Sequence, residues 1–253
     1  MDKKEYYFMS ILSFEWDARD KVAKRDNYVI DVHPTVWLKS IQQERLYYIE
    51  FWQQITKEQH DLFNPPDAGS QARQDAFVLS LIDVGTFLDI GCYYPASLNN
   101  TIKLEANGWT GLAIDIVDYS DMWKSRTTPF VCADALTYDF TAALTGFPDV
   151  IDYLSLDVEG DGDRYKVLVN VLSSMHTFKI ITIEHDRYKK GHLESEATPQ
   201  RELLTEMGYF LLCEDVIADF RPFEDWWVNP KYVDNYTHYK SKGLHCDQIM
   251  KLI

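Results

Sequence analysis

The chain has 253 residues, of which 40 are Asp or Glu and 25 are Lys or Arg, so its formal net charge at pH 7 is −15. This negative charge disfavours a nucleic-acid partner, because phosphate backbones need Lys and Arg to displace their counterions, and it disfavours an anionic membrane surface. Apolar residues make up 46% of the chain and charged residues 26%, which is ordinary for a soluble globular protein with one large α/β domain and an extension.

Targeting signals and cysteines add little to this picture. We find no secretory signal and no apolar run of about 18 residues, so we expect a cytoplasmic protein without a membrane span. The cysteines show neither metal-ligand nor redox spacing and are interpreted as reduced thiols: Cys92, Cys132, Cys213 and Cys246.

The first part of the chain differs in pattern from the rest. Between Val36 and Phe63 apolar residues recur at helical spacing, which predicts one long helix that ends at Asn64–Pro66. We therefore expect an N-terminal helical extension over residues 1–66 and a second domain over residues 67–253. Because long helices usually serve packing, we expect the extension to be an accessory layer or a contact in a homodimer.

From Phe87 onward, short β-rich runs alternate with helical stretches. This alternation predicts a mainly parallel sheet with helices on both faces. One helix is expected from about Gln71 to Ile82 and another from about Ser97 to Glu105. The predicted strands are Phe87–Ile90, Leu112–Ile116, Phe130–Cys132, Tyr153–Leu156, Ile180–Ile183 and Tyr209–Leu212.

Each of the first three of these runs has a carboxylate within two residues of its end: Asp89, Asp115 and Asp134. Because ligands of open parallel sheets bind beyond the carboxyl ends of the strands, the three acids would face one crevice that suits a cofactor with a ribose and an adenine. We expect Asp115 to bind the ribose hydroxyls and Asp134 to accept from the adenine amino group. The predicted cofactor-binding residues are Asp89, Gly91, Cys92, Asp115, Asp134 and Ala135.

The turn after the first strand narrows the choice of cofactor. Gly91 permits close backbone approach to a ligand, but no further glycine follows, so the dinucleotide fingerprint Gly-x-Gly-x-x-Gly is absent. This counts against an NAD-linked oxidoreductase and leaves S-adenosylmethionine, which has no pyrophosphate to cradle. The competing interpretation is an ordinary α/β domain whose strand-end acids cap loops.

Two later strands are also followed by acids, which suit a hard cation such as Mg²⁺ or Mn²⁺. His185 is the nearest candidate general base, and Asp157 is the alternative. Neighbouring strand residues point to opposite faces, so His185 reaches the crevice only if the strand has ended by Glu184. The alternative is a set of solvated loop acids beside a packed histidine. The predicted metal ligands are Asp157, Glu159, Glu184 and Asp186.

Several segments between about Ser70 and Pro230 follow the pattern of a known family: Ser70–Leu79, Phe87–Gly91, Ser97–Thr101, Gly108–Gly111, Ile151–Gly160, Ile181–His185, Met207–Tyr209 and Asp225–Val228. On these segments the chain resembles the FkbM family of S-adenosylmethionine-dependent methyltransferases. The resemblance implies a Rossmann-like class I methyltransferase fold with a seven-stranded, mainly parallel sheet. It also implies O-methyl transfer to a hydroxyl of a sugar, glycan or glycosylated natural product.

Three positions depart from the family pattern. Cys92 stands where the cofactor loop usually has Ala, and Asp115 stands where the family usually has Glu. Pro95, which has a fixed φ and no N–H, takes the place of the loop's last Gly. Pro95 favours the alternative of a non-catalytic binding or scaffold protein, whereas the acids after the fourth and fifth strands favour an enzyme. The sequence leaves open whether the acceptor is a free sugar, a nucleotide-sugar, a lipid-linked glycan or a peptide.

Overall fold

The computed structural model describes residues 69–159, 163–185, 197–218 and 221–252, together with three short strands between residues 15 and 31. The chain divides into two compact units, Met1–Ile55 and Thr56–Ile253. In the first unit, the strands form an antiparallel sheet in the order β1-β2-β3. Their bounds are β1 (Glu15–Asp17), β2 (Val22–Arg25) and β3 (Tyr28–Asp31).

These three strands differ from the sequence-based expectation, which names only helix within residues 1–66. The helix predicted over Val36–Phe63 lies outside the described residues. The domain boundary predicted after residue 66 stays a prediction.

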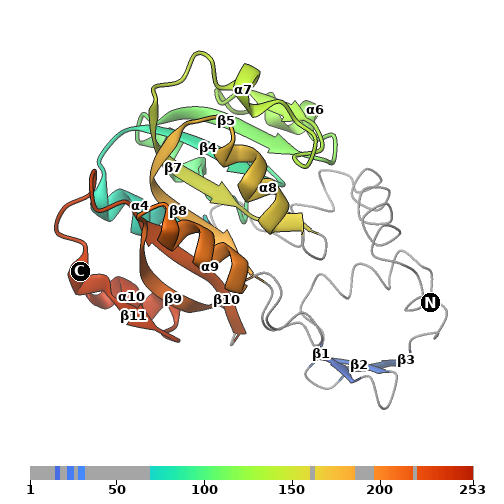
Figure 1. Cartoon of the computed structure of the whole chain (residues 1–253). Helices are drawn as coiled ribbons and strands as arrows, with labels where there is room; N and C mark the ends of the chain where they lie inside the picture. Colours follow the sequence, from blue (N-terminus) through green and yellow to red (C-terminus); the bar gives the residue numbers. More distant parts are fainter. Residues whose placement is uncertain are drawn as a thin grey trace. The chain divides into compact units, whose positions relative to one another are not determined.

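The second unit is built on an eight-stranded sheet in the order β11-β9-β10-β8-β7-β4-β5-β6 (Figure 1). The five strands from β8 to the edge strand β6 are parallel, and β10 runs antiparallel to both β8 and β9. The mainly parallel sheet predicted from the sequence is therefore confirmed. The strands are β4 (Thr86–Ile90), β5 (Thr110–Asp115), β6 (Phe130–Cys132), β7 (Val150–Leu156), β8 (Thr177–Glu184), β9 (Phe210–Ala218), β10 (Arg221–Val228) and β11 (Ser241–Lys242).

The second half of the sheet differs in detail from the predicted strands. β10 is not among the runs predicted from alternation, because Glu224 and Asp225 interrupt its apolar pattern although both are buried. The two-residue strand β11 pairs with β9 and adds an edge to the seven strands expected.

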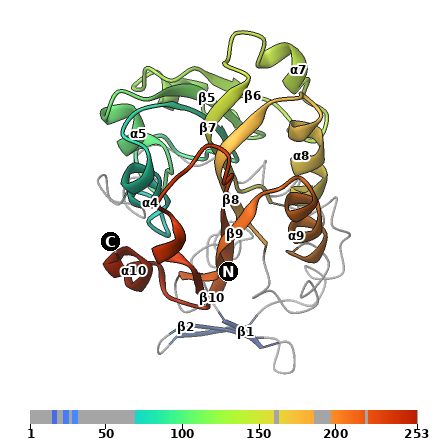
Figure 2. The same ribbon diagram turned by 60° about the vertical axis from the view of Figure 1, so that its left-hand side comes forward.

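Helices cover both faces of this sheet. In Figure 2, α8 and α9 lie on one side of the sheet and α4, α5 and α10 lie on the other. Within the described residues, no helix combines the length and apolarity needed to cross a membrane. The helices are α4 (Gln74–Leu81), α5 (Ile102–Ala106), α6 (Ser120–Trp123), α7 (Phe140–Ala143), α8 (Asp163–Leu172), α9 (Ala197–Glu206) and α10 (Cys246–Ile249), with 3₁₀ turns at η2 (Thr237–Tyr239) and η3 (Met250–Leu252).

The alternation of side chains along the strands divides the core into two layers. On the α4 side, Phe87 of β4 and Trp226 of β10 pack with Phe77 of α4. On the α8 side, Leu88 of β4 and Trp227 of β10 belong to the other apolar cluster. Consecutive residues of β4 and β10 thus serve opposite faces, which is why Asp89 points toward the α4 and α5 side.

Candidate functional site: the carboxyl edge of the sheet

The carboxyl ends of the parallel strands meet at one edge of the sheet, and the strand order reverses there. β4 pairs with β5 on one side and with β7 on the other. In open α/β sheets, ligands bind in the crevice at such a reversal. The segments that leave β4 and β7 therefore border the candidate site.

Gly91 begins the segment that leaves β4 and adopts a φ of +78°. Its N–H and that of Cys92 donate to the carbonyl oxygen of Ile114 at 2.9 and 3.2 Å. A Cβ atom at Gly91 would clash with the carbonyl oxygen of Asp157. The sequence suggests that glycine admits a ligand here, but in the structure it admits the segment that leaves β7.

Cys92 contributes its backbone rather than its thiol. Its carbonyl oxygen accepts a hydrogen bond from Nδ2 of Asn99 at 2.8 Å. Burial raises the pKa of the Cys92 thiol well above its ordinary range, and the neighbouring Asp115 and Asp89 add to the shift. The thiol therefore stays protonated, and we assign it no nucleophilic role.

Asp115 ends β5 and ties two segments together. Its carboxylate accepts from the N–H of Tyr93 at 2.9 Å and from the N–H of Val117 at 2.8 Å. Burial raises the pKa of Asp115 to about 6, although these backbone hydrogen bonds oppose the shift. The acid thus links the turn after β5 to the segment after β4, at the place where the sequence predicts a ribose-binding carboxylate.

Asp89 lies deeper than Asp115. Its carboxylate accepts from Oγ1 of Thr101 at 2.9 Å. Burial raises the pKa of Asp89 to about 6, against hydrogen bonds from Ser155 and Thr101 and the positive charge of Arg126. This carboxylate is surrounded by protein groups, so the structure gives it a role in holding the segment after β4 rather than direct access to a ligand.

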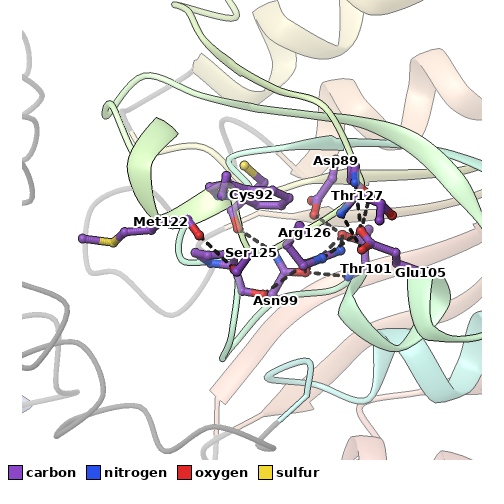
Figure 3. A network of polar contacts seen from close by, with 12 residues as sticks. Asp89, Cys92, Asn99, Thr101, Glu105, Met122, Ser125, Arg126 and Thr127 are labelled. Carbon is purple, nitrogen blue, oxygen red and sulfur yellow. Dashed lines mark hydrogen bonds and ion pairs between the residues drawn. The ribbon is translucent and has the colours of Figure 1, made fainter.

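A partly buried ion pair between Arg126 and Glu105 lies beside this segment (Figure 3). Nε of Arg126 lies 2.8 Å from Oε2 of Glu105, whose carboxylate also accepts from the N–H groups of Thr127 and Thr128 at 2.9 and 3.2 Å. Burial alone would raise the pKa of Glu105, but hydrogen bonds from Thr128, Thr127 and Arg126 lower it to about 2. Sequence reasoning missed this pair, whose members are 21 positions apart.

Asp134 and Ala135 follow β6 as expected. Oδ1 of Asp134 accepts from the N–H of Leu136 at 2.9 Å, and its carbonyl oxygen accepts from the N–H of Thr137 at 3.0 Å. Ala135 is buried in the apolar cluster on the α8 side. Asp134 therefore shapes a turn at the edge of the crevice, and its contact with adenine stays a prediction.

The segment after β7 carries Asp157 and Glu159. The N–H of Asp157 donates to the carbonyl oxygen of Ile90 at 2.9 Å, which fixes it beside the end of β4. Asp157 is partly exposed and Glu159 is exposed. Of the acids predicted on the acceptor side, Asp157 is therefore the one that the structure ties to the strand reversal.

Glu184 ends β8, but its charge is already compensated. Nε and Nη2 of Arg164 donate to its Oε2 at 3.0 and 2.6 Å. The Arg164 side chain is 0% exposed and that of Glu184 is 5% exposed. This buried pair corrects the prediction of Glu184 as a metal ligand, because the arginine occupies its carboxylate.

His185 lies on the opposite face of the sheet from Glu184. The β8 pairing continues through it, since its N–H donates to the carbonyl oxygen of Phe223 at 3.3 Å. Its side chain is 0% exposed, and its Nε2 lies 3.4 Å from Asp215 and 3.6 Å from Asp225. The placement corrects the prediction of His185 as the base, because strand alternation turns the imidazole away from the crevice.

Arg201 of α9 completes the cluster around His185. Its Nε lies 2.7 Å from Asp225, and its Nη2 lies 2.8 Å from Asp215. Burial would lower the pKa of His185, but hydrogen bonds to Asp215 and Asp225 and their negative charge raise it overall. The pKa of Asp225 is lowered, because His185 and Arg201 outweigh its burial. The cluster is therefore a compensated ion network.

The predicted metal ligands do not come together in the part of the chain that the structure describes. Two groups of three donors there have ligand atoms within 4.8 Å of one another, and neither contains Asp157, Glu159 or Glu184. The first is His185 with Asp215 and Asp225, which already holds the Arg201 guanidinium. In the second, Nδ1 of His245 accepts from the N–H of Asp247. Asp186 lies outside the described residues, and the three predicted ligands that are described do not form a donor set that fits Mg²⁺ or Mn²⁺.

Glu224 is a further buried acid that sequence reasoning missed. It faces Glu184 across the β8–β10 pairing, and Nε1 of Trp226 donates to it at 2.5 Å. Burial raises the pKa of Glu224 to about 8, despite hydrogen bonds from Trp226 and Gln74. At neutral pH this acid is mostly protonated, so it adds no charge beside Glu184.

Comparisons with known proteins establish the fold. No protein-family model matches the chain, and no curated protein matches it. The chain is similar to 1,6-didemethyltoxoflavin-N1-methyltransferase of Burkholderia thailandensis, solved with 1,6-didemethyltoxoflavin and S-adenosylhomocysteine, with a TM-score of 0.50 and 12% identity over 82% of this chain and 92% of that one. A magnesium protoporphyrin IX methyltransferase of Synechocystis matches with a TM-score of 0.48 and 15% identity over 75% of this chain and 96% of that one. The fold is thus that of the Rossmann-like class I methyltransferases.

Proposed function

We propose that the chain is an S-adenosylmethionine-dependent methyltransferase that acts on a hydroxyl of a sugar, glycan or glycosylated natural product. One observation carries the proposal: Asp115, at the end of β5, is tied by its carboxylate to the segment that leaves β4 at the strand reversal. The class I methyltransferase fold supports the cofactor, and the resemblance to the FkbM family supports a hydroxyl acceptor.

The residues present fit the cofactor. A carboxylate has about four acceptor sites, and the N–H groups of Tyr93 and Val117 are two of the donors to Asp115. Asp115 would accept from the ribose hydroxyls, Asp134 would lie toward the adenine, and segment 92–101 would hold the methionine end. When bound, S-adenosylmethionine supplies a methyl group on a sulfonium, which is an electrophile.

The protein would then have to align the acceptor and take its proton. Most of the barrier reduction in such a transfer comes from alignment. We assign this proton to Asp157, the base that the sequence offers as the alternative to His185. It lies at the strand reversal and is partly exposed. A positioned base contributes about 10²–10⁴-fold to the rate, and no metal step is part of this proposal.

Titration calorimetry with S-adenosylhomocysteine tests the cofactor site. We expect the wild type to bind, and Asp115→Ala to lose about 1.5–3 kcal/mol of binding free energy with its charge-assisted hydrogen bonds. Asp118→Ala is the matched control, because Asp118 is an exposed acid of the same turn. A wild-type protein that fails to bind would overturn the proposal, and unchanged affinity of Asp115→Ala would remove Asp115 from the site.

A non-catalytic binding or scaffold protein on the same fold is the second candidate. Pro95 in the cofactor segment favours it, as do the ion pairs that occupy Glu184 and His185. Mass spectrometry of reactions with a panel of glycosides separates the two candidates. A methylated product whose formation falls in Asp157→Asn supports the enzyme, whereas cofactor binding without product across the panel supports the scaffold.

A further inference from the structure

We propose that Arg126 is a positioning residue that holds segment 92–101 in the shape that binds the cofactor, taking over a task that loop glycines perform in the resembled family. This inference rests on the proposed function. Arg126 belongs to the connection between β5 and β6, so it acts on segment 92–101 from outside that segment.

The loop conformation needs outside support. Tyr93 and Leu98 adopt φ values of +52° and +49°, in the left-handed region that non-glycine residues rarely occupy. Such residues cost free energy and persist only where their surroundings over-determine them. With Pro95 in place of a glycine, the loop lacks residues that would adopt these conformations freely.

Arg126 supplies that support along the length of the segment (Figure 3). Its Nη1 donates to the carbonyl oxygen of Pro95 at 3.0 Å and to Oδ1 of Asn99 at 3.2 Å. Its Nη2 lies 3.4 Å from Oγ1 of Thr101, and its Nε bonds Glu105. One planar guanidinium with five donors thus joins groups from Pro95 to Glu105 in the first turn of α5, which the compact ammonium of lysine does not reproduce.

The guanidinium is itself held in place. The side chain of Arg126 is 6% exposed and lies over the Trp123 ring, 4.9 Å from its centre. Nε1 of Trp123 donates to the carbonyl oxygen of Tyr93 at 2.9 Å, and its ring stacks on Phe130. The connection between β5 and β6 therefore holds the segment by two hydrogen bonds: Trp123 donates to the carbonyl oxygen of Tyr93, and Arg126 donates to that of Pro95.

Both ends of the segment also contact the two buried acids of this half of the sheet. Tyr93 donates to Asp115, and Thr101 donates to Asp89. Arg126 bonds the same Thr101 hydroxyl that donates to Asp89, and its positive charge lowers the pKa of that acid against the effect of burial. Displacing a binding segment by about 1 Å is enough to cost up to about a hundredfold in function, so loss of this anchor should be visible in binding.

The test compares Arg126→Ala and Arg126→Lys with Lys124→Ala, an exposed cation two residues away that pairs with Asp121. Calorimetry with S-adenosylhomocysteine should show affinity about tenfold weaker or more in both Arg126 variants and a change within about twofold in Lys124→Ala. Hydrogen exchange of the amides of residues 91–101 should accelerate in the Arg126 variants, while exchange of β7 and β8 stays as in the wild type.

The outcomes separate this inference from the proposed function. A wild type that fails to bind overturns the proposed function, and the inference falls with it. Wild-type affinity in Arg126→Ala or full rescue by Arg126→Lys overturns the inference alone, as does faster exchange spread evenly over the sheet. Should Arg126→Ala fail to fold, Asn99→Ala removes an acceptor of Arg126 and the bond to the Cys92 carbonyl, and the same loss of affinity and loop protection is expected.

Discussion

The two halves of the sheet hold their buried acids in different ways. In the half formed by β4, β5 and β6, hydrogen bonds from backbone N–H groups and hydroxyls hold Asp89 and Asp115, and burial raises the pKa of both to about 6. In the half formed by β7, β8 and β10, arginines hold two of the buried acids: Arg164 pairs with Glu184, and Arg201 pairs with Asp225.

This difference separates binding capacity from stability. A carboxylate held by backbone donors keeps acceptor capacity for a ligand, at the cost of its own desolvation. A carboxylate buried against arginine is already satisfied, and removing its partner would leave an uncompensated charge. Acids at similar strand-end positions in the sequence therefore have different roles: some can bind a ligand, and others stabilise the fold.

The largest expected effect comes from breaking the ion pair of the second half. Arg164→Ala should lower the free energy of unfolding by about 3–5 kcal/mol, because Glu184 would remain buried without its counter-charge. Urea unfolding measures the change. Lys166→Ala is the control, since the Lys166 side chain is 61% exposed in its pair with Asp163 and should contribute about 0–1 kcal/mol. A loss below about 1 kcal/mol for Arg164→Ala would show that the ion pair does not stabilise this half.

Gly91 joins the two halves, and Gly91→Ala tests that contact. The new Cβ would clash with the Asp157 carbonyl, and φ at this position is +78°. We expect a loss of about 2–4 kcal/mol in the free energy of unfolding, from left-handed strain and overpacking together. Gly146→Ala is the control, because no heavy atom lies within 4 Å of a Cβ added there. Equal stability of the two variants would contradict the close approach of the strand ends.

The first half is tested by the pH dependence of stability. The folded pKa of Asp89, about 6, lies above its ordinary 3.8, so the folded state binds more protons than the unfolded state between these values. Its contribution to stability is therefore full below about pH 4 and is lost as pH rises through about 6. Relative to Asp89→Asn, the wild type should lose about 2–3 kcal/mol between pH 4 and pH 7, at about 1.4 kcal/mol per pKa unit.

Parallel urea titrations of the two proteins across that range provide the measurement. Asp118→Asn is the control, because Asp118 is exposed and its pKa is lowered. Matching pH profiles for the wild type and Asp89→Asn would show that Asp89 is not desolvated in the folded protein.

The smallest expected effect is that of His185→Gln. We expect a loss of about 1–2 kcal/mol in the free energy of unfolding, because the imidazolium loses its bonds to Asp215 and Asp225. The pKa of His185 is raised above 6.5, so this loss should be greatest below about pH 6.5 and should shrink as pH rises through the folded value. The maximal rate should fall by less than about tenfold, and a larger fall at saturating cofactor would return His185 to the role of base.

Much of the fold is readable in the sequence, because a strand that is buried on both faces must be a short apolar run and the helices between such runs repeat at their own spacing. All six predicted strands coincide with or overlap an observed strand, from β4 to β9 in chain order. β10 escaped prediction because Glu224 and Asp225 break its apolar pattern. Their burial is tolerated because partners such as Trp226, His185 and Arg201 bind their carboxylates, and the local pattern does not show partners from other elements.

For the candidate site, the sequence by itself determined where the acids of the sheet lie along the strands, and it set the rule that Glu184 and His185 face opposite sides. Only the tertiary structure decided which side faces the crevice, because that depends on how far the pairing of β8 with β10 extends. It also decided that Arg164 compensates Glu184 and that Arg126 reaches Pro95, Asn99 and Glu105. Ion pairs between distant residues have no local period, so folding alone brings their charges into contact.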